Sequence, residues 1–131
     1  MNRFLTTTLM IAAFAIGSVI PSVAFAAGDA AAGNAKFQAL CVSCHGESGK
    51  GDGPTGKALA AAGQPAPRDF TIGEFVLDSD KDGKMGTDAD IKNVITKGAL
   101  VYGGSAMMAP VQGLSDADLD NLIAFIRSLK Q

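Results

Sequence analysis

A chain of 131 residues, with no tryptophan and one tyrosine, is long enough for one small domain and too short for two independent cores. Its formal net charge of −2 argues against a nucleic-acid partner, because that function needs clustered lysine and arginine. An acidic chain of this size fits weak docking to protein partners by charge complementarity. Stripes of Val, Ile and Thr at period two are missing, so a sheet protein is not expected.

Residues 1–26 have the order of a secretory signal peptide. Arg3 gives a positive start, residues 5–20 are almost wholly apolar or small, and residues 24–26 (Ala-Phe-Ala) form a small-x-small cleavage site. The apolar run is shorter than the roughly 20 residues that a membrane-spanning helix needs. We therefore expect cleavage after Ala26, export to the periplasm and no permanent membrane span. The mature domain, residues 27–131, then has ten basic against 13 acidic residues, a net charge near −3.

The first predicted helix begins at Asp29, whose carboxylate can cap the alanine-rich segment behind it. It continues into Cys41 and places Gly33 and Phe37 near one face. Residues 46–53 are rich in glycine and charge and are typical of a loop.

A short helix is expected over residues 54–62, followed by an extended segment over residues 64–70, because its prolines remove donors and restrict their predecessors. Thr87 and Asp90 form a capping-box-like start for the second long helix, which Gly98 ends.

The last helix has its cap at residues 115–118 (Ser-Asp-Ala-Asp) and an apolar stripe of Leu119, Leu122, Ile123 and Ile126. The prediction is an all-α domain of three main helices with long loops. Loops of that length in so small a domain usually wrap a bound group.

The most informative motif is Cys41-Val42-Ser43-Cys44-His45, a C-x-x-C-H sequence of the kind that attaches c-type haem. On a helical turn, positions i and i+3 are neighbours, so the sulfurs of Cys41 and Cys44 can reach the two vinyl groups on one haem edge. His45 then projects toward the iron. The sequence predicts one covalently bound haem c.

Three other interpretations of the motif are weaker. A thioredoxin-like redox site needs a βαβ context, which the pattern does not contain. A structural zinc site needs four ligands, but the chain has two cysteines and one histidine. A plain disulfide is possible in an exported protein, but it leaves His45 without a role.

The second axial ligand of the iron is found by elimination. His45 is the only histidine, so the ligand opposite it is expected to be a methionine outside the signal peptide: Met85, Met107 or Met108. Met85 lies in a charged loop, whereas the other two lie just before the last helix, with Pro110 to fix their strand. We favour Met108 and keep Met107 as the alternative. A thioether opposite histidine raises the reduction potential, as expected for an electron carrier.

Residues 78–83 open like a calcium-binding loop, with Asp78, Asp80 and Asp82 at alternate positions and glycine sixth. The twelfth position, where such loops carry a bidentate glutamate, is Ala89. Calcium is therefore possible, but a solvated acidic turn is the favoured interpretation.

With these motifs, the chain resembles the class I cytochromes c, in their bacterial mono-haem branch. The resemblance extends over nearly all of the mature chain and includes Gly33, Phe37 and four short motifs. These are residues 51–54 (Gly-Asp-Gly-Pro), 67–70 (Pro-Arg-Asp-Phe), 108–110 (Met-Ala-Pro) and 114–118 (Leu-Ser-Asp-Ala-Asp).

The resemblance implies that Gly33 and Phe37 cross Leu122 and Phe125 of the last helix. It also implies that a proline carbonyl accepts a hydrogen bond from the axial histidine. Pro67 is the candidate, with Pro65 and Pro54 as alternatives.

Arg68 and Tyr102 are candidates for contacts to the haem propionates. The expected function is one-electron transport by a monomer between redox protein partners, with no catalytic residues. The alternatives are a haem subunit of a periplasmic oxidoreductase complex, or a haem protein that binds a ligand or acts as a peroxidase.

Overall fold

The computed structural model describes residues 28–131, so the predicted signal peptide and its cleavage after Ala26 lie outside the described residues. The described part is all-α and contains no strand, which confirms the predicted fold class. None of its helices has both the length and the apolar composition needed to cross a membrane. The elements, in chain order, are α1 (Ala30–Leu40), α2 (Val42–His45), α3 (Pro54–Ala61), α4 (Asp88–Lys97), the 3₁₀ helix η1 (Leu100–Tyr102) and α5 (Asp116–Ser128).

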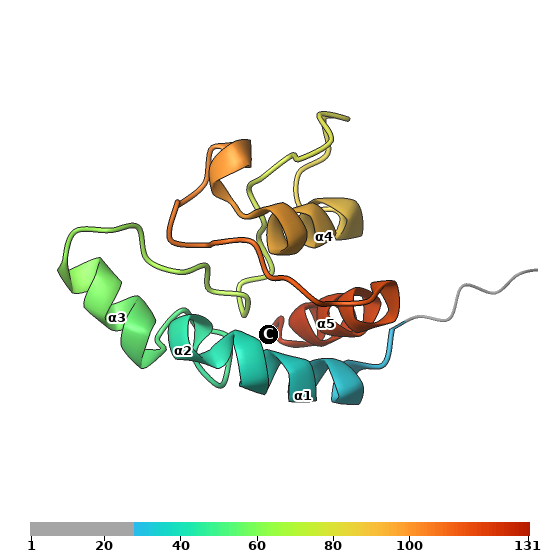
Figure 1. Cartoon of the computed structure of the whole chain (residues 1–131), viewed down its shortest axis with the longest axis horizontal. Coiled ribbons are helices and arrows are strands. Elements are labelled where there is room, and N and C mark those ends of the chain that lie inside the picture. Colours follow the sequence, from blue (N-terminus) through green and yellow to red (C-terminus); the bar gives the residue numbers. More distant parts are fainter. Residues whose placement is uncertain (1–27) are drawn as a thin grey trace, which may run out of the picture.

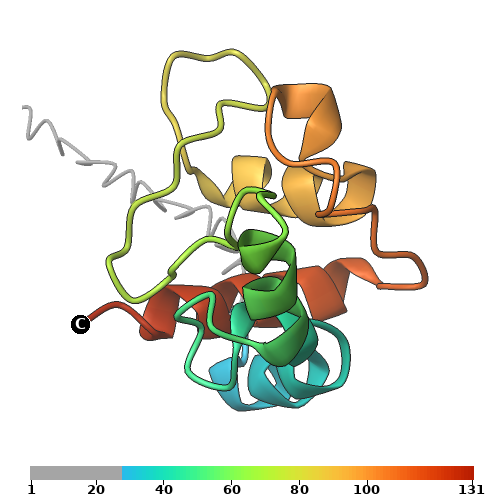
Figure 2. The same cartoon turned by 90° about the vertical axis from the view of Figure 1, so that its left-hand side faces the viewer.

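Helices α1 and α5 form the main helix pair of the domain. They cross: α5 is foreshortened in Figure 1 and runs across the view in Figure 2, where α1 is seen nearly end-on. Gly33 is buried at the crossing, where a Cβ would overlap the backbone carbonyl of Asn121 and lie 2.9 Å from the Cβ of Phe125. Phe37 follows one turn later, with its ring centroid 5.1 Å from that of Phe125. The expected contact of this helix face with α5 is confirmed.

The predicted helix starts are confirmed by their hydrogen bonds. Asp29 accepts bonds from the first amides of α1, and α4 and α5 both begin with complete capping boxes. One boundary differs from the prediction, because α1 ends at Leu40 and Cys41 is its C-cap, with a φ of −116° that departs from helical geometry. The Cys41 carbonyl still accepts from the amides of Cys44 and His45, at 3.2 and 2.9 Å, so the attachment motif keeps a helical turn.

The core is a single apolar cluster formed by α1, α4, α5 and Phe70 of the long loop. Phe37 and Leu122 are its most deeply buried side chains. The stripe predicted for the last helix is buried in full: Leu119, Leu122, Ile123 and Ile126.

Residues 62–87 form a long connection between α3 and α4 that is fastened to α5. The Arg127 guanidinium donates to Asp88 Oδ1 from Nε (3.0 Å) and Nη2 (2.8 Å), and to the Gly86 carbonyl at 2.5 Å. It also lies over the ring of Phe75, 4.9 Å from the centroid. The last helix therefore holds the later part of this connection in place.

Replacing Gly33 with alanine tests the helix crossing. In an exposed helix, alanine stabilises relative to glycine by about 0.5–1 kcal/mol. At Gly33 the added Cβ has to displace the backbone of α5, so we expect G33A to lower the free energy of unfolding by about 1–3 kcal/mol. Chemical denaturation measures this, with Ala35→Gly on the exposed face of α1 as the control for helix propensity. A stabilised G33A protein would contradict the crossing described here.

Candidate functional site

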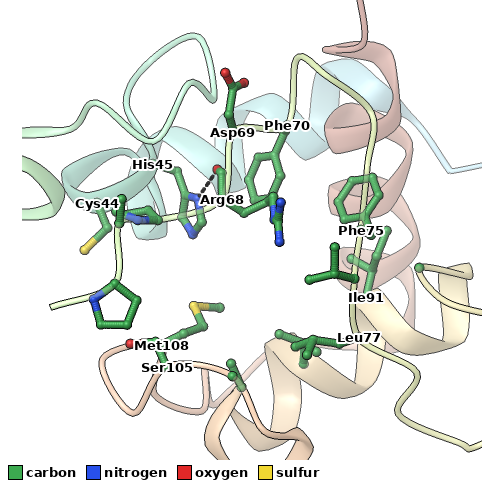
Figure 3. A pocket seen from close by; sticks show the side chains of 18 of the residues that line it. Cys44, His45, Arg68, Asp69, Phe70, Phe75, Leu77, Ile91, Ser105 and Met108 are labelled. Atoms are coloured by element: carbon green, nitrogen blue, oxygen red, sulfur yellow. Dashed lines mark hydrogen bonds between the residues drawn. The ribbon is translucent and has the colours of Figure 1, made fainter. Parts of the chain in front are cut away.

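A cavity of about 610 Å³ lies between the helices and the two long connections (Figure 3). Ligand sites in proteins commonly have volumes of roughly 300–1,000 Å³. Most of the wall is apolar, and it is built by segments far apart in the sequence: α2, α3, residues 65–77, α4, residues 103–108 and Ile126 of α5. The cavity brings the C-x-x-C-H motif and the methionine pair to one site.

His45 reaches the cavity from the end of α2, with its Nδ1 atom 3.3 Å from the Arg68 carbonyl oxygen. A carbonyl can only accept, so Nδ1 carries the proton and Nε2 keeps its lone pair. Burial lowers the pKa of His45 below its usual value, and the bond to Arg68 opposes this effect only in part. The imidazole is therefore neutral at neutral pH, as a metal ligand must be.

The acceptor for His45 corrects one prediction, because it is the carbonyl of Arg68 and not that of Pro67. Neighbouring carbonyls of an extended segment point to opposite sides, so the Pro67 and Arg68 carbonyls face in opposite directions and only one of them can face His45. The Pro67 carbonyl faces Gly51 instead, where a Cβ would overlap its oxygen. The alternatives Pro65 and Pro54 do not bond to His45 either. Pro65 and Pro67 both line the cavity.

The Arg68 carbonyl is positioned by the turn that follows it. Asp69 Oδ1 accepts hydrogen bonds from the amide and the hydroxyl of Thr71, at 2.8 and 2.6 Å, which is an Asx turn. The Phe70 amide donates to the Gly49 carbonyl at 2.8 Å, and the Gln131 amide donates to that of Thr71 at 3.0 Å. The segment that orients His45 is thus fastened at both ends.

Aromatic side chains support the imidazole on one side. The ring of Phe70 stacks on His45 with centroids 4.5 Å apart and an interplanar angle of 18°. Phe75 stacks on Phe70 at 5.8 Å, and Phe37 meets Phe70 edge-on at 6.3 Å. The orientation of His45 is therefore set by packing as well as by its hydrogen bond.

Met108 lies across the cavity from His45, and Figure 3 shows its sulfur pointing toward the imidazole. Met107 also lines the cavity but is 47% exposed. Met85 is 64% exposed and does not contribute to the wall, as its charged loop predicted. Both methionines of the pair are near the site, with the half-buried Met108 facing the histidine.

The two cysteines are not joined in a disulfide. Cys44 lines the cavity, whereas Cys41 is half-buried against the apolar core one turn earlier. Burial, with a smaller contribution from Cys44, raises the pKa of the Cys41 thiol to about 11. Both sulfurs are thus available for another covalent bond.

Of the two residues expected near the haem propionates, Arg68 and Tyr102, only Arg68 lines the cavity. Arg68 is half-buried in the cavity wall, and its side chain points into the cavity in Figure 3. Tyr102 does not line the cavity, and its contact with a propionate stays a prediction. The chain reverses direction after η1, with Gly103 in a left-handed conformation, and Gly103, Gly104 and Ser105 reach the wall instead.

The sequence profile of the family described as Cytochrome c matches residues 30–130. The chain belongs to the cytochrome c family. It is 40% identical over 105 residues to cytochrome c-554(547) of Halothiobacillus neapolitanus, which covers 79% of this chain and 100% of that relative. It is also 32% identical over 130 residues to cytochrome c4 of Azotobacter vinelandii, covering 99% of this chain and 52% of the relative.

Among solved structures, this cytochrome c is similar to a chain of the reducing HAO-like protein complex of Kuenenia stuttgartiensis. The TM-score is 0.57 at 27% sequence identity, and the match covers 76% of this chain and 41% of that chain. The domain described here therefore spans about half of cytochrome c4 and less than half of the structural neighbour.

The cytochrome c family implies a covalently bound haem c, and the residues of the cavity fit that group. The wall is mostly apolar, a neutral imidazole and a thioether face each other across it, and two free thiols lie on the helical turn that carries the histidine. This is the donor set of a c-type haem with mixed axial ligands.

The predicted acidic loop lies outside the cavity. Carboxylate oxygens of Asp78, Asp80 and Asp82 lie within 4.8 Å of one another, and several accept hydrogen bonds from the loop's own amides. Ala89 supplies no side-chain ligand, and the next carboxylate, Asp90, bonds to Ser79 and Thr87 instead. A solvated acidic turn stays the favoured prediction for this loop, with calcium binding as the alternative.

The sequence reasoning assigned Pro67 and Arg68 of the 62–87 connection to the site but missed the contribution of its later part. Phe75 and Leu77 of this segment line the wall, and so does Asp90 at the start of α4. The short apolar run Phe75-Val76-Leu77 is the signal that could have revealed a segment of the cavity wall in this connection. Asp90 was identified only as part of a helix cap.

Replacing Phe70 tests the aromatic support of His45. Phe70 is 9% exposed and contacts three other aromatic rings, so we expect F70A to lower the free energy of unfolding by about 3–5 kcal/mol. Ile72→Ala, two residues later and 51% exposed, should change it by less than about 1 kcal/mol. Denaturant unfolding of both variants measures the difference. Equal stabilities would show that the aromatic stack does not hold this segment.

Proposed function

We propose that this cytochrome c is a periplasmic one-electron carrier with one haem, and not an enzyme. The haem is attached through Cys41 and Cys44, and its iron is ligated by His45 and Met108. The observation that carries the proposal is the pair of facing groups in the cavity, a neutral imidazole with its lone pair free and a thioether opposite it. With His45 and Met108 both holding the iron, a substrate would have no free position on the metal.

The bound haem supplies an iron that alternates between ferric and ferrous states. Around it, Arg68 and Phe70 keep the His45 ring in one orientation, so a change of oxidation state requires little rearrangement of that ligand. The apolar wall excludes water, which together with a thioether ligand favours the ferrous state.

Within this proposal, we assign Arg68 to the haem propionates. Its guanidinium points into the cavity and forms no ion pair with any residue of the part of the chain that the structure describes. A half-buried cation without a carboxylate partner is suited to the anionic propionates of a haem.

The partners we propose are redox proteins that approach the open side of the cavity. Apolar side chains are exposed there: Ile72, Val76 and Met107.

A second candidate function is that of a haem subunit in a larger oxidoreductase. The observation that favours it is the structural similarity to a chain of a reducing HAO-like protein complex. The exposed apolar residues at the cavity would then lie at a permanent interface. Size-exclusion chromatography of a native extract separates the two cases, because a free carrier elutes as a monomer.

The first experiment is expression with a working haem-maturation system. We expect an exported protein without residues 1–26 whose mass includes one covalent haem, and ferrous protein that does not bind carbon monoxide at neutral pH. The exchange of one cysteine, as in C44S, should leave a single thioether, whereas Ser43→Ala should leave both. A colourless protein would contradict the proposal, and rapid carbon monoxide binding would favour a ligand-binding or peroxidatic haem protein.

The axial methionine is tested by comparing two adjacent substitutions. We expect M108A to abolish the far-red charge-transfer band of a methionine–ferric iron bond and to lower the reduction potential, because a soft ligand that stabilises the ferrous state is lost. M107A, at the more exposed position, should keep the band. The opposite result would assign the ligand to Met107, and retention of the band in both variants would exclude the pair.

A further inference from the structure

One buried acidic residue of the cavity wall has no part in the functions described above. Asp90 is 1% exposed and belongs to the wall together with Ile91, Val94 and Ile95 of the same helix. An ionised group in such surroundings is costly unless it is fully hydrogen-bonded. Its position next to a proposed haem therefore requires an explanation.

The hydrogen bonds of Asp90 favour its ionised form. Oδ1 accepts from the Ser79 amide (2.5 Å) and hydroxyl (2.8 Å), and Oδ2 accepts from the Thr87 amide and hydroxyl, both at 2.8 Å. Each hydroxyl accepts a bond from another donor, Asn93 Nδ2 for Ser79 and the Asp90 amide for Thr87, and its own proton is free to be donated to the carboxylate. Two amides and two hydroxyls that donate to one carboxylate favour its ionised form.

Burial alone would raise the pKa of Asp90, but these four hydrogen bonds outweigh it and hold the pKa far below its usual value. Within residues 28–131 no lysine or arginine forms an ion pair with Asp90. The negative charge is thus stabilised by neutral dipoles and is not cancelled by a cation. It remains a net charge within the wall of the cavity.

Helix capping does not account for this burial. Helix α5 also begins with a capping box, in which Asp118 accepts hydrogen bonds from the Ser115 amide (3.1 Å) and hydroxyl (2.8 Å). Asp118, however, lies outside the cavity wall and pairs with Lys36 at 3.0 Å. The two caps share the bonds between the N-cap residue and the third residue of the helix, but only the carboxylate at α4 belongs to a residue of the cavity wall and has no cationic partner in the described chain.

We propose that Asp90 is a fixed negative charge that stabilises the ferric state of the bound haem and so lowers its reduction potential. The inference rests on the proposed function, in which a redox protein supplies the electron that converts ferric to ferrous iron. The ferric state carries one more positive charge, so a nearby carboxylate stabilises it more than the ferrous state. Because the charge is buried, salt screens this interaction only weakly.

The experiment compares the reduction potential of the wild-type holoprotein with that of Asp90→Asn and Asp90→Gln. Both substitutions remove the charge, and glutamine is a natural partner in a capping box. We expect the potential to shift upward in both variants, whereas Asp118→Asn, which removes the same charge from the other cap, should leave it close to the wild-type value. Asp90→Glu, which keeps the charge, should stay nearer to the wild type than either neutral variant.

The sign of the shift separates a charge from a merely structural role. If loss of Asp90 only loosened the wall, water would enter and favour the ferric state, and the potential would fall. A lowered or unchanged potential in a neutral variant that still holds haem would therefore overturn the inference.

Equal shifts in Asp90→Asn and Asp118→Asn would overturn it as well. Carboxyl ¹³C NMR of the ferrous wild-type protein gives a check that needs no variant, since a protonated Asp90 at neutral pH would exclude the proposed charge. All these outcomes leave the proposed carrier function standing, whereas a wild-type protein without haem would remove that function itself.

Discussion

The position of His45 depends on the close contact between α1 and α5. Gly33 has no side chain, so the backbone of α1 rests on Asn121, and Phe37 fills the space one turn later against Phe125. The four-residue helix α2 is too short to be stable by itself. It takes its direction from the end of α1, because the Cys41 carbonyl accepts the first amide bonds of the motif. The helix crossing, which lies outside the cavity, therefore decides where the imidazole stands.

The imidazole is also constrained by the turn at residues 68–71. The turn at residues 68–71 is fastened to the loop before α3 and to the last residue of the chain, so the Arg68 carbonyl and the Phe70 ring meet His45 from a fixed position. The same arginine sends its backbone oxygen to the histidine and its side chain into the cavity. A single residue, Arg68, therefore both orients the His45 ring and places a cation in the cavity wall. This is why it matters that the hydrogen-bond acceptor for His45 is Arg68 and not its neighbour Pro67.

The parts of this architecture that sequence reasoning predicted are those determined by neighbouring residues. Helix caps such as Thr87 with Asp90, the apolar stripe of α5 and the C-x-x-C-H turn depend on spacings of three or four positions. The hydrogen-bond acceptor for His45 could not be derived in this way. Whether the Pro67 or the Arg68 carbonyl faces the imidazole depends on the long-range backbone hydrogen bonds of this segment to Gly49 and Gln131. Tyr102 lies outside the cavity wall, and a left-handed glycine after it turns the chain. The later part of the 62–87 connection is held by Arg127, which bonds to Asp88 from 39 residues further along the chain. A contact between residues so far apart leaves no local pattern in the sequence.

The charges of this molecule divide into two groups with different physical effects. Most of its acidic side chains are exposed, where water and salt screen them beyond roughly 8–10 Å. They act on the approach of a charged partner, and their effect falls with ionic strength. Arg68 and Asp90 lie in the wall of an apolar cavity, where the same unit of charge acts more strongly and with little screening. In the proposed carrier, different residues therefore set the net charge of the surface and the reduction potential, so partner choice and potential can change independently of each other.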